Sequence, residues 1–235
     1  MVIGPFINAG AVLVGGLIGA LLSQRLPERL RVSMTSIFGL ASLGIGLLLV
    51  IKCANMPVMV LATLIGALIG EICFLEKGIN SAVSRIQKRM LKPGKNNSHE
   101  NFIQSFVAII VLFCASGTGI FGSMHEGMTG DPTILIAKSF LDFFTAMIFA
   151  CSLGFAVCAI SIPMLVIQLS LAFCAFLILP FTTPSMMADF TSVGGLLLLA
   201  TGLRICGIKM FAVVNMLPAL LLAMPISAAW TAFFA

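Results

Sequence analysis

The sequence predicts an all-α fold, a polytopic transmembrane helical bundle of about eight spans that forms a single integral membrane domain over residues 1–235. Hydrophobic residues make up 60% of the chain and charged residues only 9%, and the mean hydropathy is +1.17. A soluble domain of this size needs a charged surface. Apolar runs near the ~20 residues that cross a bilayer recur along the chain, and most basic residues fall in the short loops between them.

The expected spans follow these apolar runs in order. We place them at residues 3–24, 33–53, 56–75, 102–123, 132–152, 156–179, 185–203 and 209–234. The first run begins at Val2 with no basic residue before it and no small-residue cleavage pattern after it, so we expect it to remain as a span. The boundary between the fifth and sixth spans is the least distinct, and we place that turn at Ser152 to Phe155.

The positions of the basic residues orient these spans. Of the 13 Lys and Arg residues, all but Lys52 and Lys138 lie in the loops after the first, third and seventh spans: Arg25, Arg29, Arg31, Lys77, Arg85, Lys88, Arg89, Lys92, Lys95, Arg204 and Lys209. The positive-inside rule makes that side cytoplasmic and places both termini outside. Glu126, Asp131 and Asp189 then face the outer compartment. A seven-span count would break this alternation.

The long polar stretch at residues 76–101 is expected to be a cytoplasmic amphipathic loop. Within it Ile79, Val83, Ile86 and Met90 repeat at helical spacing, opposite the basic residues. This pattern is typical of a short helix that lies on the anionic cytoplasmic leaflet. A docking site for a partner is the alternative interpretation.

Residue usage disfavours several function classes. The net charge of +5 comes mainly from loop residues that orient the helices, so we expect no nucleic-acid binding. The 7 cysteines are scattered through apolar segments without a CxxC pair, which favours small buried side chains over metal ligands or disulfides. No HExxH motif or other catalytic constellation is present in the sequence, so we expect neither an enzyme nor a cofactor.

Two of the expected spans repeat one another. Residues 34–51 align without a gap on residues 190–207. The identical pairs are Thr35/Thr191, Ser36/Ser192, Gly39/Gly195, Leu40/Leu196, Leu43/Leu199, Gly46/Gly202 and Leu47/Leu203. Because the second and seventh spans run in opposite directions, the match predicts an inverted repeat, a device with which many secondary transporters build two conformations around a midplane site. Chance similarity between two helices rich in Gly and Leu is the alternative.

Several longer motifs occur together along the chain. They are INAGAVLVGGLIGALLSQRLPERL near the start, GSMHEGMTGD and KSFLDFF in the middle, and VGGLLLLATGLRICGIK with VVNMLPALLLA near the end. On these motifs the chain resembles, over essentially its whole length, the YqgA-type bacterial inner-membrane proteins, a family of unknown function. The resemblance implies a bacterial inner-membrane location and a helical fold. It implies no substrate, so a mechanism has to follow from the residues.

An ionisable pair lies inside the fifth expected span. Asp142 is about ten residues into that span, near the bilayer midplane, and Lys138 lies one helical turn earlier on the same face. A carboxylate there costs several kcal/mol unless it is paired, hydrated or protonated, which makes the pair a candidate ion or substrate site. The alternatives are a salt bridge that only locks the helices together, or a span boundary that leaves Asp142 at a wet edge.

Other polar residues extend this candidate pathway. Asn8 and Asn215 each lie near a proline, and Pro218 and Pro225 remove backbone hydrogen bonds inside the eighth span, where freed carbonyls could coordinate Na⁺ or a polar solute. An ordinary proline kink is the alternative. Thr118 and Gln168 are further pore-lining candidates.

The segment GSMHEGMTGDPT, residues 122–133, is expected to be an outer loop. His125, Glu126 and Asp131 could form an outer cation mouth or a proton-sensitive gate there, with a simple solvated loop as the alternative. Asp131 before Pro132 is also suited to starting the next helix.

These features together predict a small inner-membrane transporter or channel for a small ion or polar solute, with proton or cation coupling left open. The pairs Gly15/Gly19 and Gly66/Gly70 have GxxxG spacing, which predicts tight helix packing and allows a homodimer. The alternative function is a non-transporting membrane scaffold or sensor that acts through the basic loop.

Overall fold

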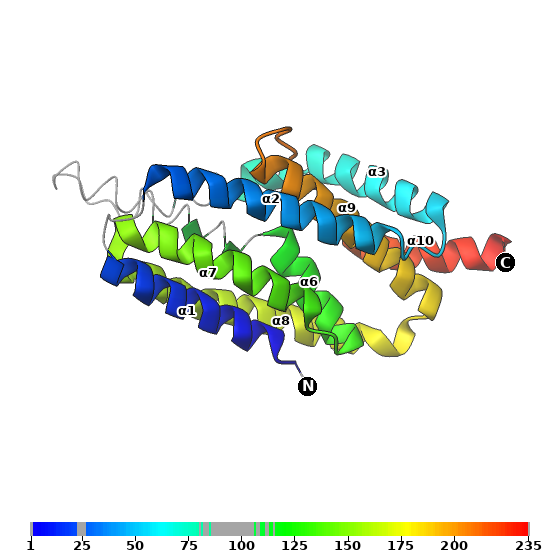
Figure 1. Cartoon of the computed structure of the whole chain (residues 1–235). Coiled ribbons are helices and arrows are strands. Elements are labelled where there is room, and N and C mark those ends of the chain that lie inside the picture. The colour runs from blue at the N-terminus through cyan, green and yellow to red at the C-terminus, as the bar shows by residue number, and fades with distance from the viewer. Residues whose placement is uncertain are drawn as a thin grey trace. The chain divides into compact units, whose positions relative to one another are not determined.

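The computed structural model describes residues 2–22, 27–79, 81, 85, 106, 109–110, 113–114 and 116–234. Within these residues every regular element is helical, which confirms the all-α fold (Figure 1). The α-helices are α1 (Gly4–Leu22), α2 (Glu28–Val50), α3 (Met56–Ile72), α6 (Gly117–Thr129), α7 (Thr133–Leu153), α8 (Ser161–Ile178), α9 (Pro184–Ile205) and α10 (Pro218–Phe234). Three 3₁₀ segments join them, η1 (Gly154–Ile160), η2 (Leu179–Phe181) and η3 (Val213–Met216).

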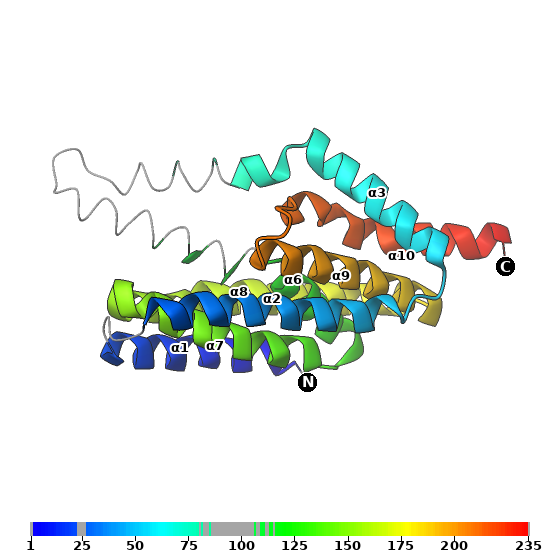
Figure 2. The same ribbon diagram turned by 45° about the horizontal axis from the view of Figure 1, so that its top comes forward.

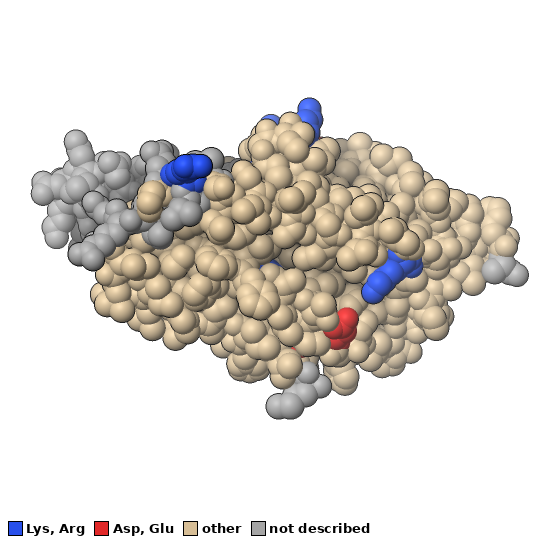
Figure 3. Space-filling view, viewed as in Figure 1, with Lys and Arg blue, Asp and Glu red and all other residues tan. Residues whose placement is uncertain are grey.

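In the part of the chain that the structure describes, four helical stretches are long and apolar enough to cross a membrane: Gly4–Leu22, Thr133–Phe181, Pro184–Ile205 and Val213–Phe234. Two shorter apolar helices, Ser36–Val50 and Met56–Ile72, accompany them. Many large apolar side chains point outward from these helices, and the face drawn in Figure 3 carries few charged residues. A surface of this kind is suited to lipid contact.

The chain divides into two compact units, each built from separate parts of the sequence. The first unit comprises Met1–Met34 and Lys77–Ala172, and the second comprises Thr35–Glu76 and Phe173–Ala235. The predicted amphipathic loop at 76–101 lies outside the described residues except for 76–79, 81 and 85.

In the first unit, α1 packs along α7 through backbone contact (Figure 1). A Cβ added to Gly15 would come within 3.0 Å of the Phe143 carbonyl oxygen, and one added to Gly19 would come equally close to that of Met147. Because both partners advance by four residues, the two helices run parallel. Only glycine permits this approach, so the Gly15/Gly19 motif serves contact within the chain.

In the second unit, two antiparallel helix pairs form by the same means. Gly66 faces the backbone of Ala219, and Gly70 faces that of Asn215, which brings α3 against α10 (Figure 2). The other pair joins α2 to α9 through the glycines Gly39, Gly46, Gly195 and Gly202. Since both GxxxG motifs are used inside the chain, they no longer argue for a homodimer.

A buried carboxylate ties the second unit together. Asp189 of α9 is fully buried and accepts hydrogen bonds from the amides of Ala54 (3.1 Å) and Asn55 (2.7 Å) at the start of α3. It also accepts from Asn55 Nδ2 (3.1 Å) and from Ser227 Oγ of α10 (2.7 Å). Asp189 is therefore buried within the unit rather than exposed to solvent, and the side of the membrane on which it lies stays a prediction. The amides at a helix N-terminus favour a negative charge, and they draw this side chain inward.

The boundaries of several predicted elements can be compared with the structure. The turn placed at Ser152 to Phe155 is confirmed, because α7 ends at Leu153 and Gly154 adopts a positive φ of 64°. The expected loop at 122–133 is wrong, since α6 continues to Thr129. Pro218 is also not an internal break, because it is the first residue of α10, where its missing amide costs little. Pro225 does lie inside that helix.

The α1–α7 contact generates a test of packing. Gly19→Ala should lower the free energy of unfolding by about 1–3 kcal/mol, because its Cβ meets the Met147 backbone, which cannot give way as a side chain can. Gly10→Ala, on the same helix with no atom within 4 Å of the new Cβ, should be neutral or stabilise by up to about 1 kcal/mol. Thermal unfolding in detergent measures both, and equal effects would contradict the contact.

Candidate functional site

A break in the helical path marks the interior of the first unit. Phe113 and Cys114 are helical, Ser116 is extended with φ −73° and ψ 133°, and α6 begins at Gly117. Ser116 caps the new helix, because its Oγ accepts a hydrogen bond from the Gly119 amide at 3.1 Å. The predicted fourth span at 102–123 is thus interrupted, although most of its first half lies outside the described residues.

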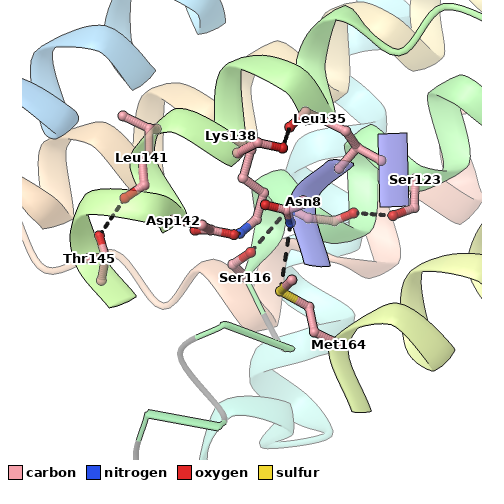
Figure 4. A network of polar contacts seen from close by, with 11 residues as sticks. Asn8, Ser116, Ser123, Leu135, Lys138, Leu141, Asp142, Thr145 and Met164 are labelled. Carbon is pink, nitrogen blue, oxygen red and sulfur yellow. Dashed lines mark hydrogen bonds and ion pairs between the residues drawn. The ribbon is translucent and has the colours of Figure 1, made fainter. Parts of the chain in front are cut away.

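The predicted ionisable pair lies beside this break. Lys138 Nζ donates a hydrogen bond to Asp142 Oδ2 one turn later on α7, and both residues are buried (Figure 4). The ammonium also lies 5.9 Å from the centre of the Phe113 ring, a cation–π distance. Asp142 lies near the middle of α7, as expected from the span boundaries. The pair has no net charge, which lowers the cost of keeping it in an apolar interior.

Two amide side chains from other helices complete the cluster. Asn8 of α1 is fully buried and reaches Asp142, and its Nδ2 donates to Met164 Sδ of α8 at 3.6 Å (Figure 4). Its Oδ1 has no hydrogen-bond partner among the residues that the structure describes. Gln168 of α8 is only 2% exposed, and within the described part of the chain neither its Nε2 nor its Oε1 has a hydrogen-bond partner. Each such buried polar group costs about 1–3 kcal/mol, so these unpaired groups require an explanation.

The space beside Gly119 is where these groups converge. A Cβ added to Gly119 would lie 2.8 Å from Ser116 Oγ, 3.0 Å from Lys138 Cε and 3.5 Å from Gln168 Nε2. The N-terminal turn of α6, the end of the Lys138 side chain and the Gln168 amide therefore lie close together beside Gly119. We call the set Asn8, Ser116, Lys138, Asp142 and Gln168 the polar cluster.

The structure gathers most of the predicted pathway residues. Asn8, Lys138, Asp142 and Gln168 belong to the polar cluster, and Thr118 is buried on the first turn of α6. Asn215 belongs to the second unit, where its Oδ1 accepts a hydrogen bond from the Glu76 amide at 2.8 Å. An ion-coordinating role for Asn215 stays a prediction.

The predicted outer mouth is rearranged by the extension of α6. His125 and Glu126 are buried on that helix, and Glu126 Oε1 accepts hydrogen bonds from the amides of Ile3 (2.7 Å) and Gly4 (2.9 Å) at the start of α1. Only Asp131 remains in the connection, where its Oδ1 accepts from the Thr133 amide at 3.0 Å and so helps to start α7. Glu126 thus fastens one helix to another, rather than lying in open loop. A role for the three residues as a mouth or gate stays a prediction.

Sequence reasoning missed Ser116 and Gly119. The available signal was the run Ser116-Gly117-Thr118-Gly119, because a hydroxyl residue followed by two glycines is a poor continuation of an apolar helix and a good start for a new one. Among the described residues, no three His, Cys, Asp or Glu side chains are grouped as metal ligands.

Comparison with known proteins places the chain. The model of the family described as "Protein of unknown function (DUF554)" matches residues 3–228. The chain is 80% identical over 235 residues to "Uncharacterized protein YqgA" of Escherichia coli (strain K12), with 100% of both chains covered. It is 26% identical over 223 residues to "Uncharacterized membrane protein YdfK" of Bacillus subtilis (strain 168), with 93% of both covered. No solved structure matches.

The resemblance inferred from the sequence motifs is confirmed by these matches. The long apolar helices and the similarity to a membrane protein both indicate a location in a membrane. This chain is a membrane protein that belongs to the DUF554 family.

Proposed function

We propose that the protein is a small transporter or channel of the bacterial inner membrane for a small ion or polar solute, with Lys138 and Asp142 as its charge switch. The observation that carries this proposal is the polar cluster, in which a buried ion pair lies near Asn8 Oδ1 and the Gln168 amide, both without a hydrogen-bond partner among the described residues. Lipid tails cannot form hydrogen bonds with such groups, so we expect their partner to be water or a solute that enters from outside the bilayer.

A purely structural salt bridge explains the cluster less well. Replacing a buried ion pair with apolar residues of similar volume is often neutral or stabilising, so a pair of this kind is weak evidence for stability. Gln168 adds to the difficulty, because a residue that only fills space does not need an amide with both ends unpaired. Ionisable residues inside membrane helices commonly mark ion and substrate pathways.

The switch works through exchange of partners. While Asp142 is ionised it holds Lys138, and the two side chains lie along α7. A proton on Asp142 removes the attraction and releases the ammonium to a different partner. The two states differ in which groups Lys138 contacts, and that difference biases the conformations on either side of the transport step.

The contact between α2 and α9 supports the inverted repeat. A Cβ added to Gly39 would lie 3.0 Å from both Gly202 O and Cys206 N. A Cβ added to Gly195 would lie 2.8 Å from both Gly46 O and Val50 N. The two aligned segments are 156 positions apart. Adding 156 to the α2 residue and subtracting 156 from the α9 residues turns the first set of contacts into the second. The contacts of Gly46 and Gly202 exchange in the same way. A pseudo-two-fold axis across the helices, lying between Ser42 and Leu198, accounts for this exchange.

Helix directions support the proposed topology, with both termini periplasmic. Parallel α1 and α7 agree with their places as first and fifth spans. Antiparallel α3 and α10 agree with their places as third and eighth spans, because an odd number of crossings then separates them. The basic loops lie on the cytoplasmic side in this arrangement.

Loss of the carboxylate tests the switch. Asp142→Asn, reconstituted in proteoliposomes and screened with Na⁺, K⁺, chloride, pyruvate and glycerol, should lose any flux that the unchanged protein supports, because the amide cannot release Lys138 by taking up a proton. Glu71→Gln on the exposed part of α3 should keep that flux. Normal flux in Asp142→Asn would contradict the switch. A transporter that lacks residues 86–100 should also keep its flux. A scaffold that acts through this loop would instead lose its partner in that deletion, and its partner binding would not depend on Asp142.

A double substitution separates stability from function. Lys138→Met or Asp142→Asn alone should lower the free energy of unfolding by about 3–5 kcal/mol, since each leaves a buried polar partner uncompensated. The double variant should recover most of this stability, as measured by thermal unfolding in detergent, and should still lack flux. A double variant with both normal stability and normal flux would reduce the pair to a structural salt bridge.

A further inference from the structure

Building on the proposed transport function, we propose that the solute carries an anionic group, which binds at the N-terminus of α6 against Lys138, and that it moves together with one proton held by Asp142. The shared chemistry is a small anion, either inorganic or the carboxylate of a small organic solute. An inorganic anion and an organic carboxylate would accept hydrogen bonds from the same donors, and the uptake experiment below distinguishes the two.

Hydrogen-bond donors are in excess beside Gly119. The N-terminus of the 13-residue helix α6 carries a partial positive charge and first-turn amides without intrahelical partners. Lys138 supplies three N–H groups, of which the hydrogen bond to Asp142 uses one. The Ser116 hydroxyl accepts from Gly119 and keeps its own proton available for donation. Such a set binds anions.

Gln168 independently indicates a ligand at the same place. Its amide comes from a different helix, is almost fully buried and is unpaired at both ends. Its Nε2 lies 3.5 Å from the position of a Cβ on Gly119, on the same side as Lys138 Cε and Ser116 Oγ. A buried amide donor that lies beside a helix N-terminus, with the end of a lysine side chain next to it, indicates a negatively charged occupant.

Charge balance then determines the coupling. With Lys138 and Asp142 paired, the empty site has zero net charge. An anion alone would make it −1 and a proton alone would make it +1, and an isolated charge is expensive inside the membrane. An anion on Lys138 together with a proton on Asp142 returns the site to zero. Both the empty and the fully loaded site are therefore neutral, and the transport cycle moves one anion and one proton in the same direction.

Within the described ranges, few other titratable groups lie close enough to take this role. Cys114, in the segment before α6, lies near enough to Lys138 and Asp142 to interact with them electrostatically. The helices packed against α7 add His125 and Glu126 from α6 and Cys158 from η1, while α1 contributes only Asn8 as a polar group. Glu126 is engaged at the start of α1 and His125 lies beside Thr129. Asp142 is thus the carboxylate next to Lys138.

The experiment measures proton-coupled anion uptake by the full-length protein in proteoliposomes. Labelled chloride and labelled pyruvate serve as the inorganic and carboxylate probes, and Na⁺ and glycerol are the non-anionic probes. An inward proton gradient should accelerate uptake of at least one anion, an internal pH dye should report acidification that accompanies it, and clamping the membrane potential at different values should leave the rate unchanged. Chloride alone, pyruvate alone or both would each support the site and name its source of negative charge.

A matched pair of alanine substitutions tests the location. Gly119→Ala places a methyl group where Ser116, Lys138 and Gln168 meet, and should reduce anion uptake about tenfold or more. Gly122→Ala adds a methyl group to the same helix against Leu135 and Ile134, with nearest atoms at 3.0 and 3.1 Å, and should keep uptake within about twofold. Gln168→Leu, which removes the unpaired amide without adding bulk at the glycine, should reduce uptake as Gly119→Ala does. Elution as a single peak in detergent checks that each variant is folded.

The outcomes separate this inference from the function beneath it. Flux of Na⁺ or glycerol that depends on Asp142, with no anion uptake, would overturn the anion site and leave the transporter standing. Anion uptake that follows the membrane potential would overturn the neutral one-to-one coupling. Equal loss in Gly119→Ala and Gly122→Ala would overturn the location. No Asp142-dependent flux of any probe would overturn the transport function itself.

Discussion

The arrangement of the first unit depends on one constraint, that charge buried in a membrane protein has to be compensated locally. Lys138 and Asp142 satisfy it by their spacing of one helical turn on α7. The neighbouring groups follow from the same constraint. Asn8 supports the carboxylate from α1, and the ring of Phe113 lies near the ammonium. The buried carboxylates Glu126 and Asp189 are compensated differently, each by the amides at the start of another helix.

Close backbone contact makes these side-chain positions well defined. Glycines on α1, α2, α3, α6 and α9 remove the side chain that would keep neighbouring backbones apart. Without a hydrophobic driving force between helices in lipid, packing at this distance is a main source of association. The conspicuous glycine content of the sequence therefore has a structural use at many positions, and it does not by itself indicate a second copy of the chain.

Much of the fold was predictable because composition and periodicity report lipid exposure directly. The Lys138–Asp142 pair was predictable too, since helical spacing alone brings the two side chains together. Gln168 and Asn8 could be suspected as polar residues in apolar runs, but no local signal shows that they converge. The helical form of residues 122–129 was not predictable, because four glycines between 117 and 127 lower helix propensity and tertiary packing overrides it. The burial of Asp189 was not predictable, because its partners, Ala54 and Asn55, are distant in sequence.

The glycine contacts of the first unit also limit how its interior can open. Gly15 and Gly19 join α1 to α7 by direct backbone contact, and Gly127 joins α6 to α8 in the same way, against the Ala172 carbonyl. Because these contacts join backbone to backbone, we expect each pair to move as one body in the proposed transport cycle. Asn8, Lys138 and Asp142 belong to one body, whereas the α6 N-terminus and Gln168 belong to the other. In that cycle, access to the groups beside Gly119 requires one helix pair to slide past the other, and the groups within each pair would then move together.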